Sequence, residues 1–186
     1  MIFDLDGTLT RPYLDFDVMR REIGVEGPIL ESLASLDPAS REQAEAILLR
    51  YERQAADEST LQDGAVEVVE VCRQLGYPVA ILTRNARPTV EIVLAKHGFS
   101  VDALRTREDG AVKPSGEQLL SLCCELNADP CHSWMVGDYL FDILSGREAG
   151  TKTVLMIGDK PTPDYADQAD HVIRRLADLL EFLPIG

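Results

Sequence analysis

The sequence has no apolar run close to the roughly 18 residues that a membrane-spanning helix needs. Its first residues, Met1 to Asp4, carry neither a basic segment nor a long apolar one, so we expect no secretory signal. It also has no repeat and no low-complexity tract, and its composition excludes collagen-like, coiled-coil and wholly disordered chains. The 186 residues suffice for one domain, or for a core with a small accessory module, with a sizeable buried interior.

Basic residues are scarce. The chain has 18 lysines and arginines against 32 aspartates and glutamates, which gives a net charge of −14. Such an acidic protein is a poor general binder of nucleic acid or of an anionic membrane. We therefore expect neither partner, and we expect most of the charge to form a solvated surface, although a local basic pocket for a phosphate remains compatible with it.

Cysteines are few, and their spacing is not that of a zinc or redox motif. They are Cys72, Cys123, Cys124 and Cys131. No CxxC pair occurs, and the adjacency of Cys123 and Cys124 disfavours a bridge between them. We predict free thiols and a reducing, cytoplasmic location.

Short apolar runs alternate with helical patterns along most of the chain. The predicted strands are residues 1–3, 79–82, 134–136, 153–157 and 171–173. The predicted helices between them are roughly residues 64–75, 87–97, 116–126, 140–149 and 175–183. This alternation is typical of a parallel sheet covered on both faces. The sequence therefore predicts an α/β fold, a three-layer doubly wound parallel sheet.

Residues 12–62 interrupt the alternation, because they contain no convincing strand pattern. Their apolar residues recur at helical spacing and predict helices at about 14–23, 28–36 and 39–57. We interpret 12–62 as a small all-α cap inserted after the first strand. The core then consists of 1–11 and 63–186.

Polar side chains follow the predicted strands where each strand ends, or lie in a neighbouring loop. These residues are Asp4, Asp6, Thr83, Arg84, Asn85, Lys113, Asp138 and Asp142. In open α/β sheets, ligands bind outside the carboxyl ends of the strands. We therefore expect these side chains to converge at one edge of the sheet.

Four carboxylates in one pocket would repel one another strongly. A divalent cation and Lys113 together would neutralise three of the four negative charges, and oxygen ligands without histidine or cysteine favour Mg²⁺. Asp4 and Asp6 are two positions apart, so both can face the same way where the strand ends; one can attack while the other transfers protons. Gly7 permits a tight turn, and we expect the Thr8 hydroxyl to hold this loop by hydrogen bonding.

Four segments resemble the motifs of one enzyme superfamily. The run Asp-Leu-Asp-Gly-Thr-Leu at 4–9 resembles the first motif of the haloacid dehalogenase (HAD) superfamily of phosphohydrolases. Residues 81–83 resemble its second motif and Lys113-Pro114 its third. Gly137-Asp138 with Asp142 resembles the fourth, and the order and separations suit the superfamily.

The resemblance implies a Rossmann-like core and Mg²⁺-dependent hydrolysis of a phosphomonoester of a small metabolite. Asp4 would be the nucleophile and would form an aspartyl-phosphate. Asp6 would protonate the leaving oxygen and then activate water. Thr83 and the backbone N–H of Arg84 would bind phosphoryl oxygens, and Lys113 would bridge Asp4 and the phosphate.

The resemblance also implies a metal site. Asp4, the backbone carbonyl of Asp6 and Asp138 would bind Mg²⁺. Asp142 would orient a metal-bound water or Lys113. Because Asp4 must be ionised and Asp6 protonated for the first step, we expect a bell-shaped dependence of activity on pH.

The acid at position 6 is absent from the dehalogenase branches, so carbon–halogen chemistry is not expected. The position of the cap resembles the branch of phosphoglycolate phosphatase and β-phosphoglucomutase, although about 50 residues is short for such a cap. Members usually have a longer first strand than the three residues before Asp4, so either the strand is short or the sequence begins within it. Phosphoglycolate, a sugar phosphate and a nucleotide monophosphate all stay open as substrates.

Two other functions are compatible with parts of the pattern. A phosphotransferase or sugar-phosphate mutase would use the same Asp4 intermediate and pass the phosphoryl group to a sugar hydroxyl. A weakly catalytic protein-binding module is disfavoured by the intact acidic residues and Lys113. Arg11, Arg20 and Arg21 could grip a substrate anion, but a solvated face is the simpler interpretation. The oligomeric state is not predicted.

Overall fold

The computed structural model describes residues 1–183 and contains a six-stranded parallel sheet. Its strands are β1 (Ile2–Phe3), β2 (Ala80–Leu82), β3 (Ala103–Arg105), β4 (Trp134–Gly137), β5 (Lys152–Met156) and β6 (His171–Ile173). Their order in the sheet is β3-β2-β1-β4-β5-β6, and every neighbouring pair is parallel. The order reverses direction at β1, as in a doubly wound fold, which confirms the predicted fold class.

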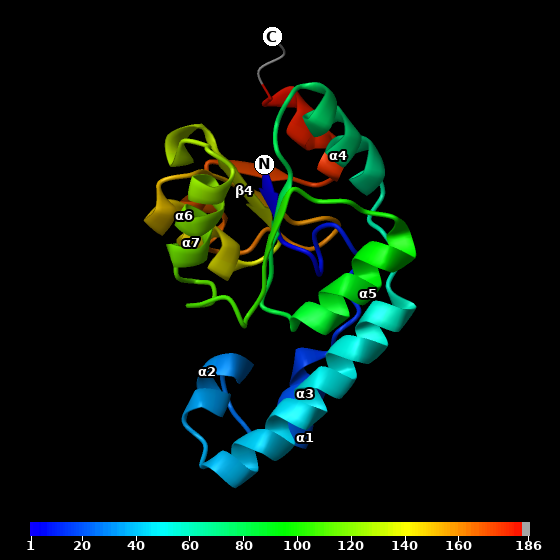
Figure 1. The fold of residues 1–186 in the computed structure, drawn as a ribbon, viewed down its shortest axis with the longest axis vertical. Coiled ribbons are helices and arrows are strands. Elements are labelled where there is room, and N and C mark those ends of the chain that lie inside the picture. The colour runs from blue at the N-terminus through cyan, green and yellow to red at the C-terminus, as the bar shows by residue number, and fades with distance from the viewer. Residues whose placement is uncertain (184–186) are drawn as a thin grey trace.

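Helices cover both faces of the sheet (Figure 1). The elements on one face are α4 (Ala65–Gln74), α5 (Arg87–His97) and the 3₁₀ helix η3 (Leu176–Glu181), and those on the other are α6 (Glu117–Glu125) and α7 (Leu140–Ala149). Successive strand residues point to opposite faces: Phe3 and Ile81 pack with the first set of helices, whereas Ile2 and Ala80 pack with the second. The predicted three layers are thereby confirmed.

Two elements differ from the expectation. Strand β3 was not predicted, because only its first residue, Ala103, is buried and its run of three residues is too short to carry an apolar pattern. The predicted helix at 175–183 is wound as a 3₁₀ helix over Leu176–Glu181, with i to i+3 hydrogen bonds such as Asp178 N to Arg175 O at 3.0 Å. The remaining 3₁₀ turns are η1 (Pro130–His132) and η2 (Ala166–Gln168).

Three helices lie beyond the carboxyl edge of the sheet and have a small apolar core of their own. They are α1 (Phe16–Ile23), α2 (Ile29–Ala34) and α3 (Pro38–Glu58). Met19, Ile29, Leu33, Ala44 and Leu48 are buried between them. Figure 1 shows α3 running alongside α5, so the long cap helix is the one that joins this group to the core. All three lie close to their predicted ranges.

The two chain segments that connect these helices to the core run side by side. Arg11 N donates to Thr60 O at 2.8 Å, Gln62 N donates to Leu9 O at 2.9 Å, and Thr10 and Leu61 form an antiparallel bridge. The chain therefore leaves the core and returns to it at one place, next to the ends predicted for the cap. We keep 12–62 as our interpretation of the cap. Within residues 1–183, no helix is both long enough and apolar enough to cross a bilayer.

Candidate active site

The register of the sheet brings three of the predicted residues to one edge. Phe3 is level with Ile81 of β2 and with Val136 of β4. The next residues along the three parallel strands therefore lead to Asp4, Thr83 and Asp138 at the carboxyl edge. Asp4 N donates to Val136 O at 2.8 Å, which holds the chain in this register past the end of β1.

Lys113 lies between two of the carboxylates, although it is far from both in sequence. Its Nζ is 2.6 Å from Asp4 Oδ1 and 2.6 Å from Asp142 Oδ1. The lysine is 3% exposed, so both ion pairs are screened little by water. Asp142 Oδ2 also accepts the backbone N–H of Tyr139 at 3.0 Å. The lysine and both aspartates are therefore held in one orientation.

Asp6 is held by neighbours on both carboxylate oxygens. Asn85 Nδ2 donates to Oδ2. The Thr10 hydroxyl lies within hydrogen-bond distance of Oδ1 at 3.3 Å and of the Leu5 carbonyl at 3.2 Å, and its single proton is shared between these two acceptors. The prediction that Thr8 holds this loop by a hydrogen bond is wrong, because the Thr8 hydroxyl is buried and has no partner within residues 1–183. The turn that follows Gly7 instead directs the Thr10 hydroxyl back toward the loop.

Glycine is required at two positions by close approach. Gly7 has φ of +87°, and a Cβ atom there would lie 2.4 Å from Asp138 Oδ2. A Cβ atom at Gly137 would lie 2.1 Å from Asp142 Cγ. The backbone of the first loop therefore packs directly against the Asp138 carboxylate, and the end of β4 packs against Asp142.

Burial dominates the electrostatics of this cluster. It raises the pKa of Asp4 well above its usual range, with the Lys113 charge opposing the shift and Asp142 adding to it. Burial also raises the pKa of Asp6, against the hydrogen bonds from Asn85 and Thr10. For Lys113, burial lowers the pKa, but the charges of Asp142 and Asp4 outweigh it, so the net shift is upward. Burial thus favours the protonated forms of both aspartates, whereas the lysine keeps its positive charge.

The Arg84 side chain points toward the cap. Its guanidinium pairs with both carboxylate oxygens of Glu31 in α2, at 2.6 and 2.9 Å, and donates to the Lys113 carbonyl. It also lies over the Phe141 ring, 4.9 Å from the centroid. Because the guanidinium is already paired, the backbone N–H is the group of Arg84 that can contact a phosphate. Arg11 and Arg20 pair with Asp63 and Asp17.

A second bridge from the cap to the core was missed by the sequence analysis. Glu52 of α3 is 3% exposed, pairs with Arg107 and accepts the backbone N–H of Ala86 at 3.1 Å. Ala86 follows Asn85, so this glutamate supports the loop that bonds Asp6. The signal that was available is its place at helical spacing four residues after buried Leu48.

Burial raises the pKa of Glu52 to about 7 from the ordinary 4.5, although Arg107 and the Ala86 N–H oppose the shift. The folded protein therefore binds more protons than the unfolded chain between pH 4.5 and 7, so its free energy of unfolding should fall as the pH rises through this window. A shift of this size corresponds to about 3 kcal/mol. As the pH rises through this window, we expect the free energy of unfolding of the wild type to fall by about 3 kcal/mol relative to that of Glu52→Gln. Urea unfolding at several pH values measures this difference. Identical pH profiles for the two proteins would contradict the assignment.

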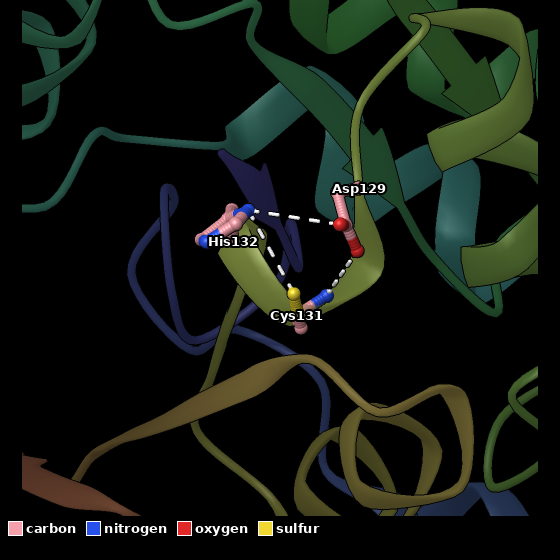
Figure 2. A group of neighbouring side chains, drawn as sticks. All are labelled: Asp129, Cys131 and His132. Atoms are coloured by element: carbon pink, nitrogen blue, oxygen red, sulfur yellow. Dashed lines mark hydrogen bonds and ion pairs between the residues drawn. The ribbon is translucent and has the colours of Figure 1, made fainter.

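A further group of potential ligands lies on the surface turn η1 (Figure 2). Asp129, Cys131 and His132 are all exposed. Asp129 Oδ1 accepts the backbone N–H of Cys131 at 3.0 Å and so caps the turn. Its Oδ2 lies 3.7 Å from His132 Nδ1. Turn capping accounts for this arrangement, and we assign no binding function to it.

A family model described as haloacid dehalogenase-like hydrolase matches residues 1–150. An uncharacterized hydrolase of Saccharomyces cerevisiae, YOR131C, is 31% identical over 98% of this chain and 89% of its own length. Pyrophosphatase PpaX of Bacillus mycoides is 30% identical over 98% of this chain and 95% of its own. The crystal structure of a hydrolase from Pseudomonas syringae has a TM-score of 0.83 at 20% identity, covering 97% of this chain and 95% of that one.

Proposed function

We propose that this chain, which belongs to the haloacid dehalogenase-like hydrolase family, hydrolyses a phosphomonoester of a small metabolite through an aspartyl-phosphate on Asp4. It is a hydrolase by family. The single observation that carries the finer proposal is the position of Lys113, with its Nζ 2.6 Å from both Asp4 and Asp142 at the carboxyl edge of the sheet. A buried cation beside a buried carboxylate favours its ionised form, which opposes the effect of burial on Asp4, and offers positive charge to an incoming phosphate.

In the first step, a carboxylate oxygen of Asp4 attacks phosphorus and the bond from phosphorus to the leaving oxygen breaks. Asp6 donates its proton to that oxygen, so an alcohol leaves. The raised pKa of Asp6 supports this role, because burial keeps the proton on the acid at higher pH than usual. The two hydrogen bonds from Asn85 and Thr10 support it as well, since they hold the carboxyl group in place.

In the second step, Asp6, now ionised, takes a proton from water as the water oxygen attacks phosphorus. The bond from phosphorus to Asp4 breaks, inorganic phosphate leaves, and both aspartates return to their starting states. The Thr83 side chain and the backbone N–H of Arg84 would hold phosphoryl oxygens during both steps. Thr83 is suited to this because its side chain is 2% exposed and lines the same cavity as Asp4.

The residues present fit a divalent cation. Asp4, Asp138 and Asp142 each offer a carboxylate oxygen within 4.8 Å of the others, and such a set of hard oxygen donors suits Mg²⁺. Asp4, Asp138 and the backbone carbonyl of Asp6 would hold the ion, while Asp142 would orient Lys113. When bound, Mg²⁺ neutralises charge on the phosphoryl oxygens. We also propose that the substrate is a small phosphorylated metabolite and that the protein acts in the cytoplasm.

The test is release of inorganic phosphate from a panel of phosphomonoesters, measured with Mg²⁺, with EDTA, and after Mg²⁺ is returned in excess. We expect release that EDTA abolishes and Mg²⁺ restores. Asp138→Asn should raise the Mg²⁺ concentration needed for half-maximal activity, because it removes a negatively charged ligand. Release that is indifferent to chelation, or no release from any ester, would contradict the proposal.

A further inference from the structure

We infer that the leaving group of the substrate is an uncharged, largely apolar alcohol. This inference rests on the proposed phosphomonoester hydrolysis and names the class of ester. It is carried by the walls of the cavity above Asp4, by three exposed aromatic side chains at that cavity, and by the pairing of every cation that lines it.

The cavity lies between the cap and the carboxyl edge of the sheet and has a volume of about 610 Å³. Cavities of roughly 300–1,000 Å³ hold drug-sized ligands, so there is room for much more than a phosphate and two carbon atoms. Its cap side is formed mainly by apolar and aromatic residues, namely Tyr13, Phe16, Met19, Ile29, Leu30 and Leu48. Met19, Ile29 and Leu48 are almost fully buried behind this wall. A leaving group that reaches into the cap therefore meets apolar surface from Tyr13, Phe16 and Leu30.

Three large aromatic side chains at this cavity are exposed to water. Tyr13 is 48% exposed, Phe16 is 51% exposed, and Tyr139, on the opposite, core side, is 54% exposed. Exposed apolar groups that gather at one cavity mark a binding site, because covering them removes apolar surface from water. Tyr139 stands edge-on to Phe141 with ring centroids 5.1 Å apart, so the core side of the cavity is aromatic too.

Within residues 1–183, no cation that lines the cavity is without a carboxylate partner. Among residues 1–183, the four cations that line it each have a carboxylate partner: Lys113 has Asp4 and Asp142, Arg84 has Glu31, Arg20 has Asp17, and Lys160 has Asp138. Of the described residues that line the cap side, Arg20 is the one basic residue, and its Nη2 is 2.5 Å from Asp17. Glu52 adds a further acidic group to the lining.

A substrate with a charged leaving group would therefore be bound poorly. The carboxylate of phosphoglycolate, or the second phosphate of pyrophosphate, would lose water and gain no unpaired cation on the cap side. An apolar alcohol has no such cost and gains by covering Tyr13, Phe16 and Tyr139. The chain should thus differ in substrate from the relative named as a pyrophosphatase.

The experiment compares kcat/KM for four probes: 2-phenylethyl phosphate, glycerol 1-phosphate, 2-phosphoglycolate and inorganic pyrophosphate, with the full chain and Mg²⁺. We expect 2-phenylethyl phosphate to exceed each of the others by at least about tenfold, the usual size of discrimination by an apolar pocket. Comparable values for all four, or a preference for either charged probe, would overturn the inference and leave the proposed function standing. No release from any probe would overturn both.

A matched pair of variants on α1 tests the wall directly. Phe16→Ala should lower kcat/KM for 2-phenylethyl phosphate by about fivefold or more and change that for glycerol 1-phosphate by much less. Val18→Ala, two residues on and not part of the lining, should leave both values unchanged. Equal losses on both probes in Phe16→Ala would overturn the inference. If that variant fails to fold, Tyr139→Ala makes the same comparison from the core side, with the same two outcomes.

Discussion

Replacing Asp4 by asparagine should lower kcat for phosphomonoester hydrolysis by at least about 10⁴-fold, because the amide removes the nucleophile. The protein should remain folded, with a free energy of unfolding equal to or above that of the wild type. Asp4 is buried beside Asp138 and Asp142, and burial raises its pKa well above the usual range. An asparagine of the same shape relieves that cost and can still accept the hydrogen bond from Lys113.

The two readouts separate a catalytic role from a structural one. Steady-state phosphate release gives the activity, and urea unfolding at pH 8 gives the stability. Asp63→Asn is the matched control, because that carboxylate is 91% exposed and pairs with Arg11 at the surface, so the substitution should leave kcat unchanged. An Asp4→Asn protein that is unfolded, or one that keeps a tenth of the wild-type rate, would contradict the assignment.

Replacing Lys113 by methionine should lower kcat/KM by about 10²–10³-fold, the usual loss when one group that stabilises developing charge is removed. It should also lower the free energy of unfolding at pH 8 by about 3–5 kcal/mol, because two buried carboxylates lose their partner. The loss of stability should shrink as the pH falls, since protonation of Asp4 removes one of the unpaired charges. Enzyme kinetics and urea unfolding over a range of pH measure both effects.

The control for this variant is Lys96→Met on α5. Lys96 is exposed and donates to the Asp57 carbonyl, so the same substitution there should change the free energy of unfolding by no more than about 0.5 kcal/mol. If Lys113→Met matched this control in kcat/KM and in the free energy of unfolding, the buried ion pairs would contribute neither to catalysis nor to stability.

Most of the sheet was predictable because its strands are buried on both faces and so form continuous apolar runs, such as residues 79–82. Strand β3 was not, because it lies at the edge of the sheet and buries only Ala103. The last segment was predicted only as helical, because the pattern of its apolar residues does not distinguish six residues of 3₁₀ helix from α-helix. Both elements were therefore hard to predict because they are short and only partly buried.

The cluster at the sheet edge was predictable from the chain because its members follow strands in a parallel sheet, and parallel strands end at one edge. The interactions between the cap and the core were not. Arg84 meets Glu31 across 53 positions, and Arg107 meets Glu52 across 55. Such ion pairs depend on how the cap sits on the core, which no local pattern describes. The sequence likewise could not show that the Thr10 hydroxyl, rather than that of Thr8, bonds this loop, because the choice depends on the path of one tight turn.

The proposed reaction depends most on a covalent phosphoryl group at Asp4. The direct measurement is to quench the enzyme with acid during turnover of an ester that it hydrolyses in the presence of Mg²⁺, and to map the modified peptide by mass spectrometry. We predict one added phosphoryl group, on Asp4, which is absent in Asp4→Asn. With 4-nitrophenyl phosphate, whose leaving group needs no proton, it should accumulate in Asp6→Asn, because only the second step then lacks a catalytic group. A phosphoryl group on another residue, or none in any of the three proteins while phosphate is released, would contradict the central claim.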